Sequence, residues 1–143
     1  MNNQRLAATL LKAGLNSVFV QIQTGLTPDQ VLISRDRKVS SIRRGTLPVP
    51  RIEDILASPS KSAFAAGLLL IYTADATDWQ RQVDPLALLS AYESYLQEHI
   101  ALAAKDAPSP LSLDEAWVLC RELRCDGETS LQNRLISSII KGH

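Results

Sequence analysis

The sequence has few cysteines and no hydrophobic run long enough to cross a bilayer. Only Cys120 and Cys125 stand among its 143 residues, and two thiols without a secretory context predict free thiols in a reducing, cytoplasmic compartment. The longest apolar run, AFAAGLLLIY at 63–72, is about half of the ~20 residues that a membrane-spanning helix needs. The N-terminus has no basic stretch leading into an apolar core and a cleavage site, so we expect no signal peptide and no membrane partner.

The residue patterns of common catalytic and metal sites are also missing. His99 and His143 are too far in sequence from Cys120 and Cys125 to complete a tetrahedral zinc site. No glycine-rich phosphate loop follows a strand. A structural or solvated role is favoured over a catalytic one for His99, which lies within a predicted helix. We therefore predict a protein that is not an enzyme and that has no metal and no cofactor.

A net charge of zero conceals an uneven distribution along the chain. Residues 1–51 hold eight Lys or Arg against two Asp, which gives +6, whereas residues 52–143 hold seven against thirteen acidic residues, which gives −6. Five of the eight N-terminal cations lie within residues 35–44. Opposite signs in the two halves predict a polyanionic partner for the first half and a different partner for the second. Chance clustering of solvated charge is the alternative.

Hydrophobic spacing and capping residues predict an all-α protein of about six or seven helices. One of them, 16–24, also fits a strand, because β-branched and aromatic residues crowd it. The predicted helices span 3–13, 16–24, 27–38, 61–76, 84–104, 112–126 and 129–141, with one short helical turn at 52–56. Inward-facing stripes are predicted on two of them, through Leu86, Leu89, Tyr92, Leu96 and Ile100, and through Leu113, Trp117, Cys120 and Leu123.

Composition divides the chain into three parts. Residues 1–46 form a basic segment that resembles a helix-turn-helix and is predicted to bind DNA. Residues 47–60 hold several prolines and are predicted to be a linker. Residues 61–143 form a helical body for the core and for oligomer assembly, and the run at 61–76 is expected to be a buried helix.

The start of the third predicted helix has a clear local signal. Gly25 supplies a turn, Thr27 can cap the helix, and Pro28 suits the first helical position. Asp29 favours the positive end of the helix dipole, and Gln30 completes a capping box with Thr27.

The pattern around this turn partly matches a helix-turn-helix. With Gly25 at the ninth position, Val20, Leu26 and Val31 occupy apolar positions, while Gln21 and Ser34 depart from the pattern. If the unit is real, its third helix enters the major groove, and the basic residues after it contact phosphates or a minor groove. The predicted DNA-binding residues are Gln30, Ser34, Arg35, Arg37, Lys38, Arg43 and Arg44. The alternative is two amphipathic core helices with solvated ends.

Three blocks of the sequence resemble the FlhC-type transcriptional activators. The stretch LAATLLKAGLNSVFVQIQTGLTPDQVLISRDRKVSSIRRGTLP looks like their N-terminal region, LLSAYESYLQEH resembles their long helix with an Ala-Tyr pair, and LSLDEAWVLCREL resembles their following Ala-Trp helix. The resemblance spans residues 3–124. FlhC subunits act with FlhD to switch on flagellar genes, and related pairs activate transfer genes of conjugative elements. The resemblance therefore implies double-stranded DNA and an FlhD-like or FlhC-like subunit as partners.

The C-terminal region departs from that family. FlhC proteins end in a four-cysteine zinc site, whereas this chain ends in GETSLQNRLISSIIKGH, without cysteine. The final helix has an apolar stripe made of Leu131, Leu135, Ile136, Ile139 and Ile140. We expect this stripe either to bind a partner subunit in place of a zinc lobe or to close the core of its own chain.

Two functions follow from these features. The first is a DNA-binding transcriptional activator subunit of the FlhC type that works in a hetero- or homo-oligomer, with RNA polymerase as a further candidate partner of the acidic body. The second is an all-α scaffold that does not bind DNA and uses its basic segment to bind an acidic protein surface.

Overall fold

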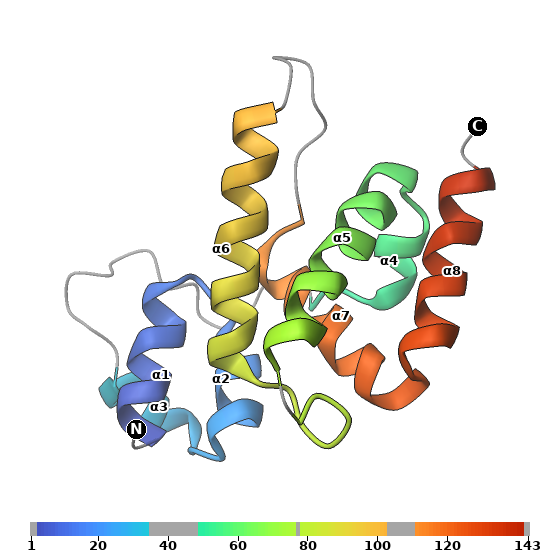
Figure 1. Ribbon diagram of the computed structural model, residues 1–143. Helices are drawn as coiled ribbons and strands as arrows, with labels where there is room; N and C mark the ends of the chain where they lie inside the picture. The colour runs from blue at the N-terminus through green and yellow to red at the C-terminus, as the bar shows by residue number, and fades with distance from the viewer. Residues whose placement is uncertain (1–2, 35–48, 77, 103–110, 142–143) are drawn as a thin grey trace. The chain divides into compact units, whose positions relative to one another are not determined.

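The computed structural model of the chain describes residues 3–34, 49–76, 78–102 and 111–141. These residues contain eight α-helices and no strand (Figure 1), so the all-α prediction is confirmed. The chain divides into two compact units, unit 1, Met1–Val49, and unit 2, Pro50–His143. The helices are α1 (Asn3–Lys12), α2 (Ser17–Thr24), α3 (Pro28–Ser34), α4 (Ile52–Leu56), α5 (Pro59–Asp75), α6 (Pro85–Leu102), α7 (Leu113–Asp126) and α8 (Glu128–Lys141).

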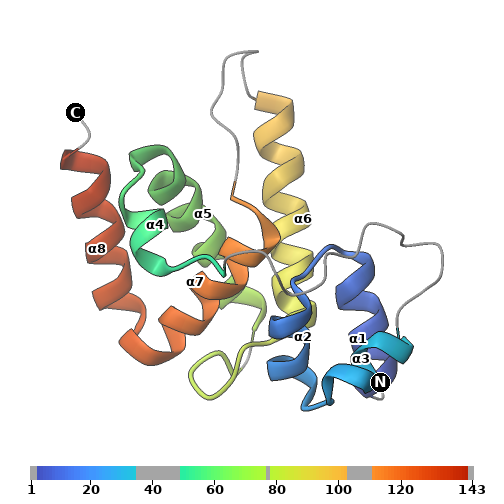
Figure 2. The same cartoon turned by 180° about the vertical axis from the view of Figure 1, so that it is seen from behind.

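Unit 1 is a three-helix unit in which each helix contacts the other two. The view from behind in Figure 2 shows α1, α2 and α3 gathered together. A Schellman-type stop ends α1, because Gly14 has φ +97° and the N–H of Leu15 donates to the carbonyl of Leu10 at 3.0 Å. The segment 16–24 is a helix and not a strand. Among the described residues of unit 1, those that are buried are Ala7, Leu10, Leu11, Leu15, Phe19, Val20, Thr24 and Val31.

In unit 2, α7 contacts four other helices, α4, α5, α6 and α8. A capping box fixes its start: the Ser112 hydroxyl accepts from the Glu115 N–H at 3.1 Å, and Glu115 Oε1 accepts from the Ser112 N–H at 3.0 Å. All six residues from 115 to 120 are buried. The predicted inward stripe of this helix is confirmed, and packing on several sides buries its other faces as well.

The segment predicted as a linker contributes to the core of unit 2. Ile52 and Ile55 of α4 are buried, and α4 packs against α5, α7 and α8. Ser58 then caps α5, since its hydroxyl accepts from the Lys61 N–H at 3.3 Å, and Pro59 takes the first helical position. Prolines therefore mark helix boundaries here, as their fixed φ allows.

The stripe predicted on α6 is only partly buried: Leu89, Tyr92 and Leu96 are half-buried, and the side chain of Ile100 lies outside the described residues. Leu86 is 47% exposed, whereas Leu88 and Ala91 are fully buried. The orientation of α6 follows from its packing on α5, where Tyr95 lies over Gly67 and its ring meets Phe64 edge-to-face at 4.3 Å between centroids. Spacing alone did not show which apolar positions face the core: Leu88 and Ala91 each precede a predicted residue by one position, a rotation of about 100° around the helix.

Helix α8 runs antiparallel to α5. Gln132 Nε2 donates to the carbonyl of Ala66 at 3.5 Å, and farther along α8 the hydroxyls of Ser138 and Ser62 are hydrogen-bonded at 2.9 Å. Leu131 and Leu135 are fully buried and close the core of unit 2. None of the helices within the described residues has the length and apolar character that crossing a membrane requires.

Candidate nucleic-acid interface

The turn between α2 and α3 has three residues, 25–27. Gly25 adopts the left-handed conformation, with φ +72° and ψ 7°, and its N–H donates to the carbonyl of Gln21 at 2.8 Å. Thr24, the last residue of α2, donates from its hydroxyl to the carbonyl of Val20 at 2.7 Å and accepts from the N–H of Leu26 at 3.3 Å. A residue with a Cβ would be strained at Gly25, so glycine sets this geometry.

The predicted capping box at the start of α3 is confirmed. The Thr27 hydroxyl accepts from the Gln30 N–H at 3.2 Å, and Gln30 Oε1 accepts from the Thr27 N–H at 2.9 Å. Gln30 is exposed on the first turn of α3. Bidentate recognition of adenine uses both the oxygen and the nitrogen of a glutamine amide. Gln30 would therefore have to exchange its capping bond for a base contact.

Residues at the apolar positions of the helix-turn-helix pattern hold α2 and α3 together. Val20 is fully buried, Val31 is 3% exposed, and Leu26 in the turn is half-buried. Helix α1 covers the same core with Leu10 and Leu11. The partial sequence match thus corresponds to two short helices joined by a three-residue turn, both of which contact α1.

Most of the predicted DNA-binding side chains lie outside the described residues. Gln30 is placed on α3, and the backbone of Ser34 forms the last residue of that helix. Asp29, beside Gln30, is exposed as well. The described cations of unit 1 are Arg5 and Lys12, both exposed on α1. The predicted residues outside the described part of the chain are Arg35, Arg37, Lys38, Arg43 and Arg44.

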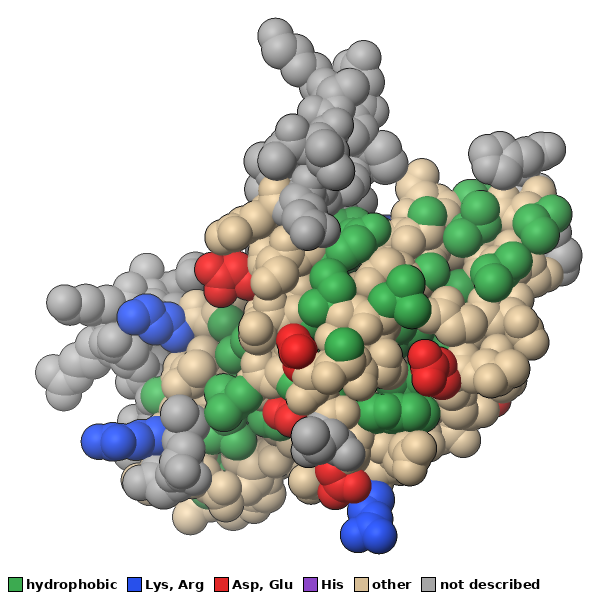
Figure 3. All heavy atoms as spheres, viewed as in Figure 1, with side chains coloured by type: hydrophobic (Ala, Val, Ile, Leu, Met, Phe, Trp, Pro, Cys, Tyr) green, Lys and Arg blue, Asp and Glu red, His purple; other side chains and the backbone are tan. Residues whose placement is uncertain are grey.

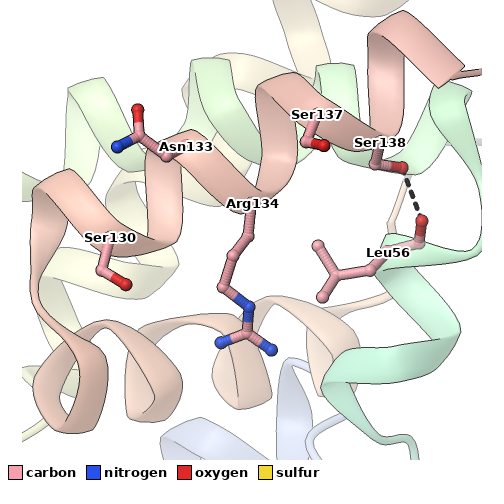
Figure 4. Close-up of a pocket in the computed structure, with 6 residues that line it drawn as sticks. All are labelled: Leu56, Ser130, Asn133, Arg134, Ser137 and Ser138. Carbon is pink, nitrogen blue, oxygen red and sulfur yellow. Dashed lines mark hydrogen bonds between the residues drawn. The ribbon is translucent and has the colours of Figure 1, made fainter.

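A hollow on unit 2, of about 480 Å³ and lined mostly by residues with polar side chains, was not predicted (Figure 4). Arg134 is one of its lining residues, and its Nη1 lies 3.0 Å from Glu122 Oε1 and 2.8 Å from Asp126 Oδ2. Polar residues spaced three and four apart on α8 were the available sequence signal. The lining residues are Leu56, Ser130, Asn133, Arg134, Ser137 and Ser138.

Electrostatics make this hollow a weak site for an anion. Two carboxylates neutralise the guanidinium of Arg134, and the hydrogen bond from Arg134 holds the pKa of Asp126 below its usual range. The charges that meet around the guanidinium therefore sum to a negative value. We assign the pair of salt bridges a structural role, since they join α8 to the C-terminal half of α7.

Within the described residues, no three His, Cys, Asp or Glu side chains are grouped so that they could hold a metal ion. Cys120 is buried and Cys125 exposed, and both thiols are free. Comparison of the chain with protein-family models, with curated proteins and with solved structures gives no match.

Proposed function

We propose that the protein is a DNA-binding transcriptional activator subunit that contacts double-stranded DNA through unit 1 and works in an oligomer. The observation that carries this proposal is the three-residue turn at Gly25. This turn joins two helices that share a core through Val20 and Val31, and α1 supports both. Such a unit presents the first turns of its second helix to the major groove.

The charge of the N-terminal region supports the same partner. Residues 1–51 carry a net +6, and five cations follow α3 directly within residues 35–44. Cations that neutralise phosphates release condensed counterions, which makes binding to DNA favourable and dependent on salt. In this proposal Arg43 and Arg44 contact phosphates, while Arg37 and Lys38 reach the groove beside α3.

The resemblance to FlhC-type activators extends the proposal to partners. It favours an FlhD-like or FlhC-like subunit bound to the same complex, and flagellar or conjugative-transfer genes as targets. The C-terminal sequence lacks the cysteines of the FlhC zinc site. In this proposal, the contacts that the zinc region makes in FlhC proteins come from a partner subunit.

A salt titration of DNA binding tests the proposal. Purified protein is mixed with fluorescent duplex DNA at low ionic strength, and the dissociation constant is measured as salt is raised. About five phosphate contacts predict a log–log slope near −4 to −5. Arg43→Ala with Arg44→Ala should weaken binding and make this slope shallower by about 2.

A matched variant controls for the loss of two positive charges. Arg81 and Arg124 are exposed cations of unit 2, and their replacement by alanine changes the net charge by the same amount. We expect this variant to bind DNA almost as the wild type does. If the protein retards no duplex at low salt, alone or with a co-purified partner, the activator proposal is wrong and the acidic-partner alternative takes its place.

A further inference from the structure

The outer side of α5 is apolar and uncovered, although the sequence predicted a buried helix. Leu70 is 63% exposed, and Ala63 and Ala74 on the same side are exposed as well. Lys61 does not interrupt this side, because its Nζ lies 2.7 Å from Glu115 Oε2 of α7. Asp75, at the C-terminal end, is the first charged residue to follow.

Helix α8 extends this apolar surface. Ile136 is 47% and Ile140 is 67% exposed, while Leu131 and Leu135 on the other side of α8 are fully buried. The stripe predicted on the final helix is thus divided between the core and the surface. Since Gln132 bonds to the Ala66 carbonyl of α5, the isoleucine that follows one turn later lies toward α5.

Figure 3 shows hydrophobic side chains gathered over α5 and α8 on one side of unit 2. No Lys or Arg of the described residues interrupts the hydrophobic side chains there. The largest apolar patch on a protein surface is often a functional one. We name it the α5–α8 face, made of Ala63, Ala66, Leu70, Ala74, Ile136 and Ile140.

We propose that the α5–α8 face binds the same face of a second copy of this chain, with the two α5 helices antiparallel about a two-fold axis. Antiparallel packing places Asp75, at the C-terminal end of one α5, near the N-terminal turn of the other. The helix dipole favours a carboxylate at that place, although Pro59 has no N–H and Ser58 already accepts from the Lys61 N–H. Both ends of the contact gain this interaction, because a two-fold interface repeats every contact.

The charge at the edge of the α5–α8 face disfavours binding partners other than a second copy of the chain. An acidic protein segment or a nucleic acid would meet Asp75 and no cation of the described residues on this face. A second copy presents a surface that is equally apolar, with acidic side chains beside it. Antiparallel packing displaces its Asp75 to the far side of the axis. Small residues such as Ala63 and Ala66 allow two helices to approach to about 8 Å between their axes.

The extent of the face predicts a reversible dimer. From Ala63 to Ala74 α5 rises by about 16 Å, and with α8 beside it the face covers on the order of 300–400 Å². A standard protein interface takes about 800 Å² from each partner. Because the face is smaller than a standard interface, we expect a weak, transient dimer that forms at high protein concentration, not an obligate dimer.

Sedimentation velocity of the full chain, without nucleic acid, tests this inference independently of DNA binding. The weight-average sedimentation coefficient is followed from about 1 μM to about 1 mM. We expect it to rise from the monomer to the dimer value. Leu70→Lys and Ile140→Lys, at two exposed positions on different helices, should each raise the dissociation constant at least tenfold, and circular dichroism should show unchanged helix content.

Leu86→Lys is the matched control. Leu86 is 47% exposed on α6, on the side away from the buried Leu88 and Ala91, and its replacement should leave the dissociation constant unchanged. A chain that stays monomeric up to about 1 mM would overturn the proposal. So would a dimer that Leu70→Lys and Leu86→Lys weaken equally, or a monomer that instead captures a different protein through the α5–α8 face.

Discussion

Lys61 Nζ lies 2.7 Å from Glu115 Oε2, across 54 positions of sequence. This ion pair joins the first turn of α5 to the first turn of α7. The side chain of Glu115 is 11% exposed and that of Lys61 is 35% exposed. The other oxygen of Glu115 accepts from the Ser112 N–H. One carboxylate therefore caps α7 and also forms an ion pair with α5.

Removal of this carboxylate should destabilise unit 2 more than removal of its charge alone. We expect Glu115→Ala to lower the free energy of unfolding by about 2–3 kcal/mol, because it removes both the cap and the ion pair. Glu115→Gln retains a capping oxygen and should cost about 1 kcal/mol. Urea denaturation of the variants gives the values. Equal losses for the two variants would show that the cap contributes nothing.

Gly67→Ala should destabilise the protein even though alanine is the better helix former. A Cβ at this position would lie 2.6 Å from the hydroxyl oxygen and 2.7 Å from Cζ of Tyr95. Tyr95 would have to move away from Phe64, which its ring meets at an interplanar angle of 82°. We expect a net loss of about 1–2 kcal/mol in the free energy of unfolding, measured by thermal or urea denaturation.

A second background isolates this contact. In a Tyr95→Ala chain the space above Gly67 is open, so Gly67→Ala should become stabilising by up to about 1 kcal/mol. If Gly67→Ala has the same effect in both backgrounds, Tyr95 is not the residue that requires glycine.

Local signals predicted how several helices begin, whereas tertiary packing decided which faces are buried. Asn16 caps α2 by accepting from the Val18 N–H at 2.9 Å, and Ser112 and Thr27 make the capping boxes that their sequences indicate. Each of these bonds joins residues within a few positions of one another. The exposure of Leu70 and the side of α6 that is buried depend instead on helices that are distant in sequence. The spacing of apolar residues within one helix gives no information about which other helices pack against it.

In the candidate site, too, local features were predicted from the sequence and contacts between distant helices were not. The turn at Gly25 and the start of α3 follow from local chemistry and were predicted. Ion pairs from Arg134 to Glu122 and Asp126 depend on the packing of α8 against α7, and no local pattern in the chain indicates them. The basic residues 35–44 remain a prediction from charge alone.

Acid should remove the contribution of Asp126 to stability. A hydrogen bond from Arg134 lowers the pKa of Asp126 in the folded state, so this carboxylate stabilises the fold above its unfolded pKa of about 3.9 and loses that effect as the pH falls through the folded value. We expect Asp126→Asn to lower the melting temperature at neutral pH, and the difference from wild type to shrink below about pH 4. Glu93→Gln, at an exposed position on α6, controls for the loss of one negative charge. A difference that stays constant with pH would contradict the role of this pair.

The two cysteines should differ in their reactivity toward iodoacetamide. Cys120 is 1% exposed, and burial raises the pKa of its thiol above the ordinary value, so little thiolate forms. Cys125 is exposed near the end of α7. In native protein at mildly alkaline pH we expect rapid alkylation of Cys125, with Cys120 modified only after addition of denaturant. Mass spectrometry of tryptic peptides distinguishes the two sites, and equal native rates would show that the core of unit 2 opens readily.

Base discrimination by α3 can be separated from phosphate binding, if the proposed function is correct. Arg43→Ala and Arg44→Ala should weaken binding to all duplexes about equally, because phosphates carry no sequence information. Arg37→Ala should instead reduce the preference for the best site over a scrambled duplex, by about 1–3 kcal/mol for each base that the arginine would have recognised.

Gln30→Glu tests base recognition by α3 without disrupting the start of the helix. A glutamate at the third helical position can still accept from the Thr27 N–H and preserve the capping box, so the fold of α3 is retained. It cannot donate to adenine, and it can accept from cytosine. Competition binding with duplexes that differ at single base pairs should therefore show a changed base preference at one position. A uniform loss over all duplexes would mean that the added negative charge acts on the DNA backbone and that Gln30 does not read a base.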